Sequence, residues 1–544
     1  MKKLISLILA ILMLCSIGFA SAESSILNPA GTLPVVSEPY TLSIGVAERS
    51  NVTDIENSYV TKWIEERTGI DIEFVFFPES DTEAKLDLMV ASGEKLPDIL
   101  AVGMYSSIRR QNYGESGVII PLNELFEKYG SAFYARCEEA GLNGDDILAR
   151  VTSPDGNIYG APFYDYYIGN ILPNRMWINQ SWLDNLGLEM PKTSEDLLNV
   201  LRAFRDNDPN GNGIADEIPM SGSGSYGLLM YLQNMFLYAD GNENWYLPLN
   251  ETNGKLEVCY DKEEYRNFLR FAKQLYDEKL IDPQIFSITD AQFNTMMSAD
   301  PSLVGVAQYW AYTPMLNHSD NWVVLPALAG PDGTQYASSA VPPCNAQMAI
   351  TKDCENPEIA FAFMTFQYID KWDRITYRWG EEGVDWERAP EDALSAYEGI
   401  GIPADMILHN DIWYTVQNTI WNGACEFPAI VTGDQQNSAI TSTETCEYQY
   451  ALQYMANVPY YVPFENQVDD IIYTVDEYNE WNDVRNAVNS YMDECRALFI
   501  TGEMDIENDW DAYLEELEAM NYKGLTAMDQ AAWERTYGTW TPAE

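Results

Sequence analysis

The stretch TLSIGVAERSNVTDIENSYVTKWIEERTGIDIEFVFFP, residues 41–78, opens a regular alternation of strand and helix patterns. Residues 41–48 form a short apolar run that is typical of a buried strand. Residues 57–69 repeat apolar side chains at helical spacing, and Gly69 is a helix stop signal. Residues 70–78 form a second apolar run, which predicts a second strand.

The alternation continues with a helix pattern over 82–94 and a third strand pattern over 96–103. Strands that alternate with helices in this order predict a parallel sheet with crossover helices. Two further strand patterns, residues 302–311 and 322–333, return late in the chain. A sheet that begins early and receives strands late predicts two lobes between which the chain passes more than once. Residues 23–40 contain three prolines and no periodicity, so we expect an extended lead-in.

The middle and C-terminal thirds of the chain are mainly helical in pattern. Apolar residues repeat on one face of each helix, as they do where a helix packs on a core. The predicted helices cover 195–206, 262–278, 356–370 and 509–520. In the last of these the apolar stripe consists of Trp510, Tyr513, Leu514, Leu517 and Met520.

The composition excludes one class of partner. The 84 acidic and 31 basic residues give a net charge of -53, and 13% of the 544 residues are aromatic. An aromatic content this high is typical of a folded chain rather than an acidic disordered one. A strongly acidic surface repels the phosphate backbone, whose binding requires clustered Lys and Arg, so we expect no nucleic-acid partner.

The N-terminus has the pattern of a secretory signal peptide over residues 1–22. Two lysines precede an apolar run, and residues 20–22 read Ala-Ser-Ala, a small-residue cleavage pattern that leaves Glu23 as the first mature residue. The run is too short to predict a membrane span. We therefore expect an extracytoplasmic protein that is secreted or associated with the cell surface. Cys15 raises lipidation as an alternative, but Leu14 stands where that processing requires a small residue, and the sequence leaves the anchor open.

The seven cysteines that follow the signal peptide are scattered, and no C-x-x-C pair indicates zinc or redox chemistry. Their odd number leaves at least one unpaired. Cys344 with Cys354, or Cys425 with Cys446, could close a small loop, and the sequence does not decide the pairing.

The stretch DNDPNGNGIADEIP, residues 206–219, gathers oxygen-bearing side chains at alternate positions around two glycines. Such spacing is typical of a loop that wraps a hard cation such as Ca²⁺. Two registers fit, one that begins at Asp206 and one that begins at Asp208, and an Asx turn without metal is the alternative. The second register predicts a structural calcium ion bound by Asp208, Asn210, Asn212, the Ile214 carbonyl, Asp216 and Glu217.

No catalytic motif is present in the sequence. The only two histidines, His318 and His409, do not form a zinc-binding H-E-x-x-H pattern, and neither a G-x-S-x-G elbow nor a phosphate-binding loop occurs. A glycosidase needs only two well-placed carboxylates, but nothing in the sequence singles out a pair. We therefore expect a protein that is not an enzyme.

With these patterns in place, the chain resembles the family 1 bacterial extracellular solute-binding proteins, the sugar- and oligosaccharide-binding components of ABC importers. The most specific segment is residues 176–222, which is similar to the alginate-binding members, where Asp-Pro-Asn-Gly-Asn-Gly leads into Asp-Glu-Ile-Pro and holds calcium. That similarity favours the register from Asp208. The resemblance continues in chain order through KLPDILAVG, DGNIYGAPF, LPALAGPDG, CENPEIAFAFMTF, RWGEEGVDWE and LFITGEMDIENDWDAYLEEL.

The resemblance implies an α/β, two-lobed periplasmic-binding-protein-like fold of type II, a Venus flytrap with hinge crossovers and a helical C-terminal part. We expect crossovers near Gly156, Gly305 and Asp370. Lobe 1 would then comprise 41–156 and 305–369, and lobe 2 would comprise 157–304 and 370–544. The family also implies a monomer that hands its solute to ABC permease subunits in the membrane.

Saccharide sites combine aromatic faces with polar side chains that bond hydroxyl groups. The candidates stand where strands end or where we expect crossovers, and the alternatives are core packing for each aromatic residue and a solvated charge for each arginine. The predicted ligand-binding residues are Arg49, Tyr105, Tyr164, Tyr166, Trp310, Arg378, Trp379, Glu382 and Trp421.

The acidic composition favours a neutral or amino sugar over a strongly anionic one. An oligopeptide is the chief alternative ligand, a secreted glycoside hydrolase the alternative enzyme, and a calcium-dependent adhesion module the alternative surface protein. Neither the identity, length and linkage of the solute nor the permease follows from the sequence.

Overall fold

The computed structural model describes residues 26–104, 106–172, 174–240, 245–312, 314–315, 320–390, 406–409, 412, 415–432 and 446–542. The signal peptide, Cys15 and His318 lie outside these residues. Within them, no helix has both the length and the apolar character that a membrane crossing requires.

The first lobe is built on a six-stranded sheet with the strand order β12-β4-β9-β3-β1-β2. β1 pairs in parallel with β2 and β3, and β12 pairs in parallel with β4, whereas β9 is antiparallel to both of its neighbours. The strands are β1 (Tyr40–Ala47), β2 (Ile70–Phe77), β3 (Ile99–Leu100), β4 (Ala161–Asp165), β9 (Cys344–Ile350) and β12 (Ile430–Val431).

The βαβαβ start that the sequence predicts is confirmed. The first crossover helix begins after Ser58, whose side chain accepts a hydrogen bond from the Thr61 amide, and it ends at Gly69 in the left-handed conformation with φ of 76°. The helices of this lobe are α2 (Tyr59–Thr68), α3 (Thr82–Ser92), α4 (Ser107–Glu115), α5 (Asn123–Tyr129), α6 (Ser131–Glu139), α7 (Gly144–Ala149), α15 (Pro357–Met364) and α16 (Lys371–Trp379).

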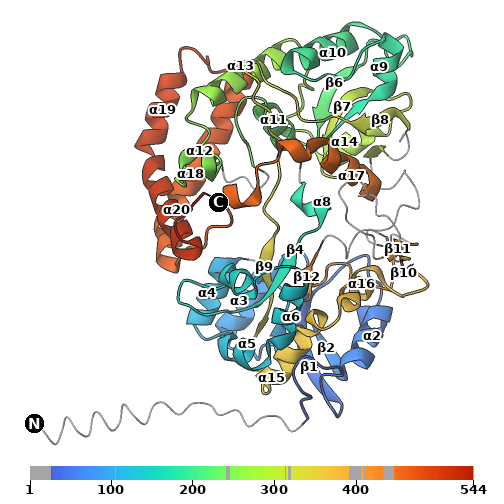
Figure 1. The fold of residues 1–544 in the computed structure, drawn as a ribbon, viewed down its shortest axis with the longest axis vertical. Helices are drawn as coiled ribbons and strands as arrows, with labels where there is room; N and C mark the ends of the chain where they lie inside the picture. The colour runs from blue at the N-terminus through green and yellow to red at the C-terminus, as the bar shows by residue number, and fades with distance from the viewer. Residues whose placement is uncertain are drawn as a thin grey trace, which may run out of the picture.

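The second lobe contains a four-stranded sheet with the order β6-β7-β5-β8, in which β5 is antiparallel to both neighbours and β6 is parallel to β7. Figure 1 shows the two sheets in separate halves of the molecule, this one in the upper half. Its strands are β5 (Arg175–Asn179), β6 (Ile218–Gly222), β7 (Val304–Tyr309) and β8 (Trp322–Val324). Its helices are α8 (Ile168–Ile171), α9 (Gln180–Leu186), α10 (Ser194–Asp206), α11 (Ser225–Gln233), α12 (Leu249–Thr252), α13 (Glu263–Asp277), α14 (Asp290–Met297) and α17 (Cys446–Asn457).

The strand pairing differs from the predicted division of the chain. β4 follows the crossover expected near Gly156 but pairs in the first sheet. β7, which contains Gly305, and β8, which follows it, were expected in lobe 1 but pair in the second sheet. β12 lies beyond Asp370 and still belongs to the first sheet. Fully buried strands have similar apolar patterns whichever sheet they join, because the pattern records burial and not the pairing partner.

The chain therefore crosses between the sheets after β4, after β8 and again after β12. A two-stranded ribbon of β10 (Trp386–Arg388) and β11 (Met406–Leu408) stands beside α16 at the first lobe (Figure 1).

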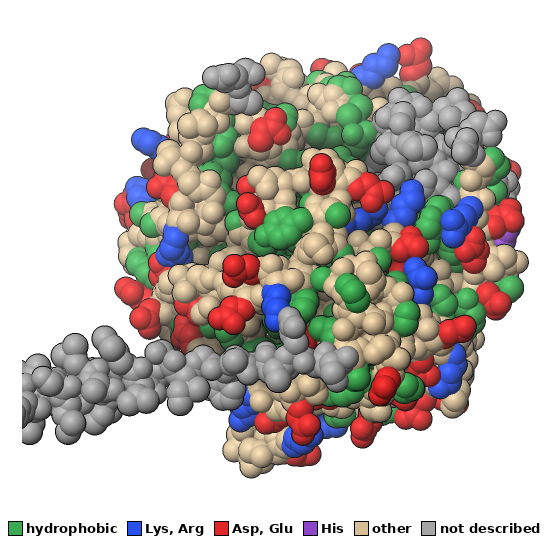
Figure 2. All heavy atoms as spheres, turned by 60° about the horizontal axis from the view of Figure 1, so that its bottom comes forward, with side chains coloured by type: hydrophobic (Ala, Val, Ile, Leu, Met, Phe, Trp, Pro, Cys, Tyr) green, Lys and Arg blue, Asp and Glu red, His purple; other side chains and the backbone are tan. Residues whose placement is uncertain are grey.

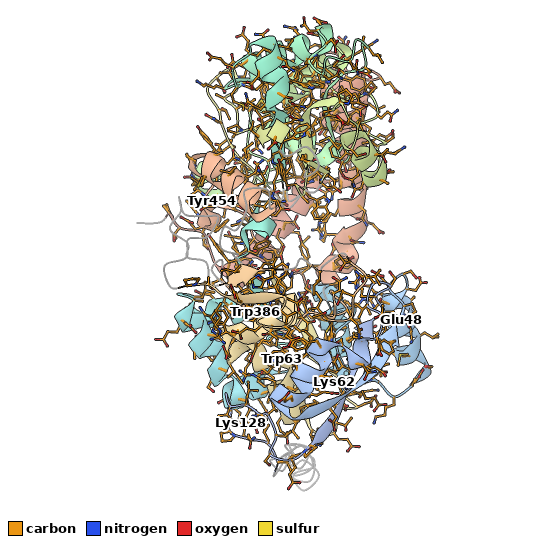
Figure 3. The ribbon with its side chains drawn as sticks, turned by 90° about the vertical axis from the view of Figure 1, so that its right-hand side faces the viewer. Glu48, Lys62, Trp63, Lys128, Trp386 and Tyr454 are labelled. Carbon is orange, nitrogen blue, oxygen red and sulfur yellow. The ribbon has the colours of Figure 1, made fainter. Side chains whose placement is uncertain are left out.

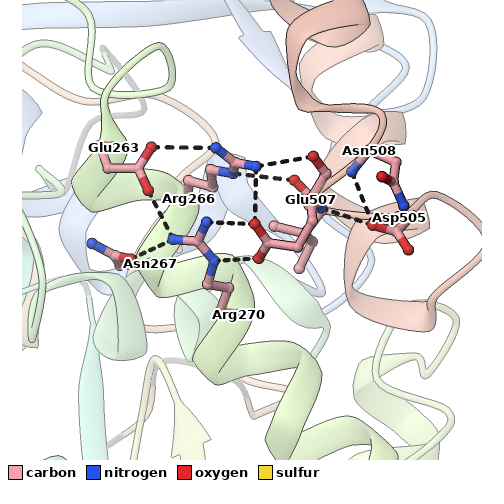
Figure 4. A network of polar contacts seen from close by, with 8 residues as sticks. Glu263, Arg266, Asn267, Arg270, Asp505, Glu507 and Asn508 are labelled. Carbon is pink, nitrogen blue, oxygen red and sulfur yellow. Dashed lines mark hydrogen bonds and ion pairs between the residues drawn. The ribbon is translucent and has the colours of Figure 1, made fainter.

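The C-terminal part is helical, as predicted, and consists of α18 (Val475–Thr501), α19 (Trp510–Ala519) and α20 (Tyr522–Tyr537). It packs on α13 through a core that includes the predicted residues Trp510, Tyr513 and Leu517. An ion-pair network holds the turn before α19 to α13, since Glu507 accepts from Arg270 Nε at 2.6 Å and from Arg266 Nη2 at 3.0 Å (Figure 4).

The cysteines of the described chain do not form the disulfides that the sequence left open. Cys344, Cys354 and Cys425 are free thiols, as are Cys137, Cys259 and Cys495. Burial raises the pKa of the Cys344 and Cys354 thiols to about 12.

Candidate functional site

The carboxyl ends of the parallel strands in the first sheet lie at one edge, where open α/β sheets bind ligands. Glu48, which follows β1, lies at the end of the first lobe that faces the second lobe, whereas Lys128 lies at its far end (Figure 3). An open pocket of about 820 Å³ lies at this edge between residues 47–56 and 76–80.

Arg49 joins three segments at this edge. Its Nε and Nη2 atoms donate to the Gly423 carbonyl at 3.1 and 2.7 Å, and its Nη1 atom pairs with Glu79, which follows β2. The predicted residue therefore stands at the expected edge, and its charge is matched by a carboxylate.

A buried charged cluster follows β4. Asp165 is 5% exposed, and burial raises the pKa of its carboxyl against the opposing charges of Arg374 and Arg378. Arg374 Nη1 pairs with Glu426 at 2.6 Å. The predicted Arg378 thus belongs to a group of charges that partly neutralise one another, with its guanidinium 5.2 Å from the centre of the Trp379 ring.

The predicted aromatic residues differ in how deeply they are buried. Trp421 and Tyr164 pack in the core of the first lobe, where Trp421 Nε1 donates to Thr61 Oγ1 at 2.7 Å. Trp379 is also buried, beside Trp386. Their burial agrees with the core-packing alternative, since binding and core packing both place large rings at strand and helix ends.

Trp310 and Tyr166 remain accessible. Trp310, directly after β7, is 48% exposed, and Tyr166 is half-buried with its ring 6.1 Å from that of Phe464. Glu382 is exposed and pairs with Arg388 Nε at 2.8 Å. Tyr105 lies outside the described residues.

A polar pocket of about 420 Å³ lies between the first lobe and the C-terminal helices, and we refer to it as the interlobe pocket. The first lobe contributes the start of α4, Arg150 and the start of β9. The second lobe and the C-terminal helices contribute residues that include Trp245, Tyr246, Tyr478, Asn489 and Asp529. None of the predicted ligand-binding residues that the structure describes lines this pocket. The sequence contains no signal for its lining, because single Asn and Tyr residues on helices form no motif.

Trp245 is held in an unusual conformation beside this pocket. Its φ of 60° lies in the left-handed region, which side chains other than glycine rarely adopt and which is concentrated at functional sites. The guanidinium of Arg496 lies 5.2 Å from its ring centre. The half-buried Trp245 thus lines the interlobe pocket, while its ring also contacts Arg496 and Tyr226.

The C-terminal wall of the interlobe pocket is fixed by hydrogen bonds to one carboxylate. Asp529 on α20 is 3% exposed and accepts from Tyr246 at 2.6 Å, from Tyr473 at 2.9 Å and from Arg485 at 2.5 Å. These bonds join α18, α20 and the segment before Val258 into one rigid wall.

In the acidic loop, Asp206 and Asp208 have different hydrogen-bond partners. Asp206 ends α10, and its carboxylate accepts from Arg205 at 2.7 and 2.9 Å. Asp208 instead accepts from the amides of Asn212 at 3.0 Å and Gly213 at 2.9 Å. The two registers are therefore distinct in the structure, since only the second turns its first carboxylate into the loop.

Glu217 is the loop's unsatisfied group. Its Oε1 atom is buried without a hydrogen-bond partner in the described chain, and burial together with Asp216 and Asp208 raises the pKa of its carboxyl. The described residues hold no group of three or more His, Cys, Asp or Glu side chains placed for a metal, but the loop's other donors are the amide oxygens of Asn210 and Asn212 and the Ile214 carbonyl. Oxygen donors of these types fit Ca²⁺.

Comparison with known proteins identifies the family. A family model described as bacterial extracellular solute-binding protein matches residues 49–371. The chain belongs to this family. It is 26% identical over 495 residues to the fructooligosaccharide ABC transporter substrate-binding protein FusA of Streptococcus pneumoniae. The alignment covers 89% of this chain and 88% of that one. The family assignment places the solute-binding chain outside the cytoplasm.

Solved structures agree with the fold. An EF-hand mutant of S. pneumoniae FusA in complex with fructo-nystose superposes with a TM-score of 0.73 at 25% identity, over 91% of this chain and 99% of that one. A solute-binding protein from Bifidobacterium longum infantis, described as HMO binding and ABC-transporter associated, superposes with a TM-score of 0.74 at 19% identity, over 92% of this chain and 99% of that one. The expected two-lobed fold of a solute-binding protein is confirmed.

Proposed function

We propose that this protein captures an oligosaccharide outside the cytoplasmic membrane and delivers it, as a monomer, to the permease subunits of an ABC importer. The observation that carries the proposal is the interlobe pocket, whose lining combines aromatic residues, among them Trp245, with amide and hydroxyl side chains between two lobes. Sugar rings present apolar C–H patches and hydroxyl groups, which aromatic faces and amides match respectively. The relatives named above support the same ligand class.

The second component of the proposal is a structural calcium ion in the loop from Asp208 to Glu217. The loop joins α10 to β6 at the end of β6 that is farther from the first sheet, since β6 runs from Ile218 toward Gly222 (Figure 1). A cation there would offset two of the three negative charges of Asp208, Asp216 and Glu217 and hold the start of β6 without contacting the solute. The FusA protein of known structure is described as an EF-hand mutant, which supports a cation loop in a relative.

The signal peptide over residues 1–22 and surface association are also part of the proposal, and the lipid anchor at Cys15 stays open. Solute binding without turnover is expected, since the relatives are named as binding proteins. His409 lies 3.7 Å from Glu387 on the exposed ribbon and has no place in the interlobe pocket.

The test is isothermal titration calorimetry of the mature chain from Glu23 against a panel of oligosaccharides and oligopeptides, with product analysis by chromatography. We expect saturable heat with at least one oligosaccharide and no change in its chain length. Binding of peptides alone would replace the ligand class, and shortened products would replace the binding protein with a glycosidase.

A further inference from the structure

Two arginines of the interlobe pocket already form ion pairs with carboxylates of the protein. Arg150 Nη2 pairs with Asp469 at 2.9 Å, and Arg485 pairs with Asp529 at 2.5 Å. Both arginines line the pocket. Both guanidinium groups therefore form their ion pairs within the protein rather than with a solute.

The third arginine of the pocket, Arg110, is 5% exposed and donates to the main-chain carbonyls of Met104 and Ala346. Burial lowers the pKa of its guanidinium to about 10, and the charge of Asp470, which also lines the pocket, acts in the opposite direction. Arg110 thus keeps its proton at neutral pH and stands near an acidic side chain. A solute carboxylate in this pocket would meet Asp470 as well as Arg110.

The charge of the rest of the surface does not favour an anionic solute either. The chain carries a net charge of -53, and Figure 2 shows acidic side chains spread over the visible face with fewer basic ones among them. An anionic solute is therefore repelled at long range and finds at short range arginines that already have carboxylate neighbours.

Two amide side chains stand on opposite walls of the pocket. Asn345 lies at the start of β9 in the first sheet, and Asn489 lies on α18 of the C-terminal helices. Both are half-buried. An amide donates and accepts hydrogen bonds, which is the pairing that an uncharged sugar hydroxyl requires.

We propose that the interlobe pocket selects uncharged saccharides over uronate-containing ones, and that Asn345 and Asn489 are its specificity-determining residues, bonding hydroxyls of one solute from the two sides. The inference rests on the proposed function and deepens it. Because the two amides belong to different parts of the molecule, a solute that bonds both also holds these parts together.

The test compares binding of uncharged oligosaccharides, including kestose, with binding of trigalacturonate to the full mature chain. The variants are Asn345→Ala and Asn489→Ala, with Asn486→Ala as the matched control, because Asn486 is exposed on the same helix and does not line the pocket. We expect each pocket variant to weaken binding of the uncharged sugar by about fivefold to fiftyfold, the cost of a lost or unsatisfied hydrogen bond. The control is expected to bind as the wild type does.

A third variant, Asp470→Asn, tests the charge balance separately. Removing the carboxylate near Arg110 is expected to increase the affinity for trigalacturonate relative to the wild type and to leave affinity for the uncharged sugar within about twofold. Thermal unfolding of every variant, without sugar, shows whether it is folded.

The outcomes separate the two proposals. Failure of the wild type to bind any saccharide overturns the proposed function. Equal affinity for trigalacturonate and the uncharged sugar, or pocket variants that bind as Asn486→Ala does, overturns the present inference and leaves saccharide binding intact.

Discussion

Arg150, at the end of α7 in the first lobe, donates through Nη2 to the carboxylate of Asp469 at 2.9 Å, and the same nitrogen donates to the Pro342 carbonyl just before β9. The side chains are only 12% and 19% exposed. The pair joins the first lobe to the segment that leads into α18, so it connects two parts of the chain across the interlobe pocket.

Arg150→Met is expected to lower the free energy of unfolding by about 3–5 kcal/mol, because it leaves the Asp469 carboxylate buried without its cation. Chemical denaturation of the mature chain measures the loss. The double variant Arg150→Met with Asp469→Leu removes the stranded charge and should recover most of it. A single variant as stable as the wild type would show that the pair does not contribute.

Removal of calcium is expected to lower the melting temperature, because an ion that binds only the folded state stabilises it by about 2.7 kcal/mol at a hundredfold excess over its Kd. Asp208→Ala should abolish the response to chelator, since this carboxylate turns into the loop. Asp206→Ala is the matched control and should keep it, because Asp206 faces Arg205. Loss of the response in Asp206→Ala alone would favour the other register.

The pair of Arg202 with Glu278 predicts a pH dependence. Hydrogen bonds from Arg202 lower the pKa of Glu278 to about 2. The unfolded chain therefore takes up this proton first, at about pH 4.3. The stability that Glu278 contributes is present above that pH and is lost as the pH falls toward 2.

Glu278→Gln should accordingly be less stable than the wild type at pH 7, and the difference should shrink on acidification, as measured by thermal unfolding between pH 7 and pH 3. Glu515→Gln, exposed on α19, is the control and should show no such convergence. A difference between Glu278→Gln and the wild type that stays constant across this range would contradict the assignment.

Trp421 and Trp310, which the sequence predicts as ligand-binding residues alike, should contribute differently to stability. Trp421→Ala removes a fully buried ring that bonds Thr61, and we expect a loss of about 3–5 kcal/mol in the free energy of unfolding. Trp310→Ala removes a ring that is 48% exposed, and a stability change within about 0.5 kcal/mol is expected.

Calorimetry then separates stability from binding in the Trp310 variant. If Trp310 contacts the solute, as the sequence predicts, the folded variant should bind the oligosaccharide more weakly than the wild type. Unchanged affinity would remove Trp310 from the site.

The sequence predicted most of the first sheet correctly because its strands and crossover helices are adjacent in the chain. The pattern from residue 41 to residue 103 and the stop at Gly69 follow from local spacing alone. The two late strands β7 and β8 were recognised as strands, but they were assigned to the first lobe and pair in the second sheet. β7 has six buried residues and no alternation, so nothing in residues 304–309 records that β5 and β6 are its neighbours.

The candidate site, too, could be predicted only where its residues are adjacent in the sequence. The acidic loop is continuous in the sequence, so the spacing of its oxygen-bearing residues could be compared with two registers of a cation-binding loop. The interlobe pocket is assembled from segments as distant as Asn345 and Asn489, each an ordinary residue in its own element. Aromatic residues such as Tyr164 were predicted to bind because strand ends and core positions coincide there, and burial separates the two only in three dimensions.

The place of β9 has a consequence for biogenesis. This strand lies between β4 and β3 in the first sheet, yet it follows every strand of the second sheet in the chain. During synthesis, therefore, the four strands of the second sheet are all available before the first sheet can close. A chain made only to residue 343 leaves the inner edges of β3 and β4 without their partner, and exposed strand edges invite pairing with other chains. The first sheet therefore begins before the second sheet and is completed after it, and until β9 is made its inner strand edges stay open to such pairing.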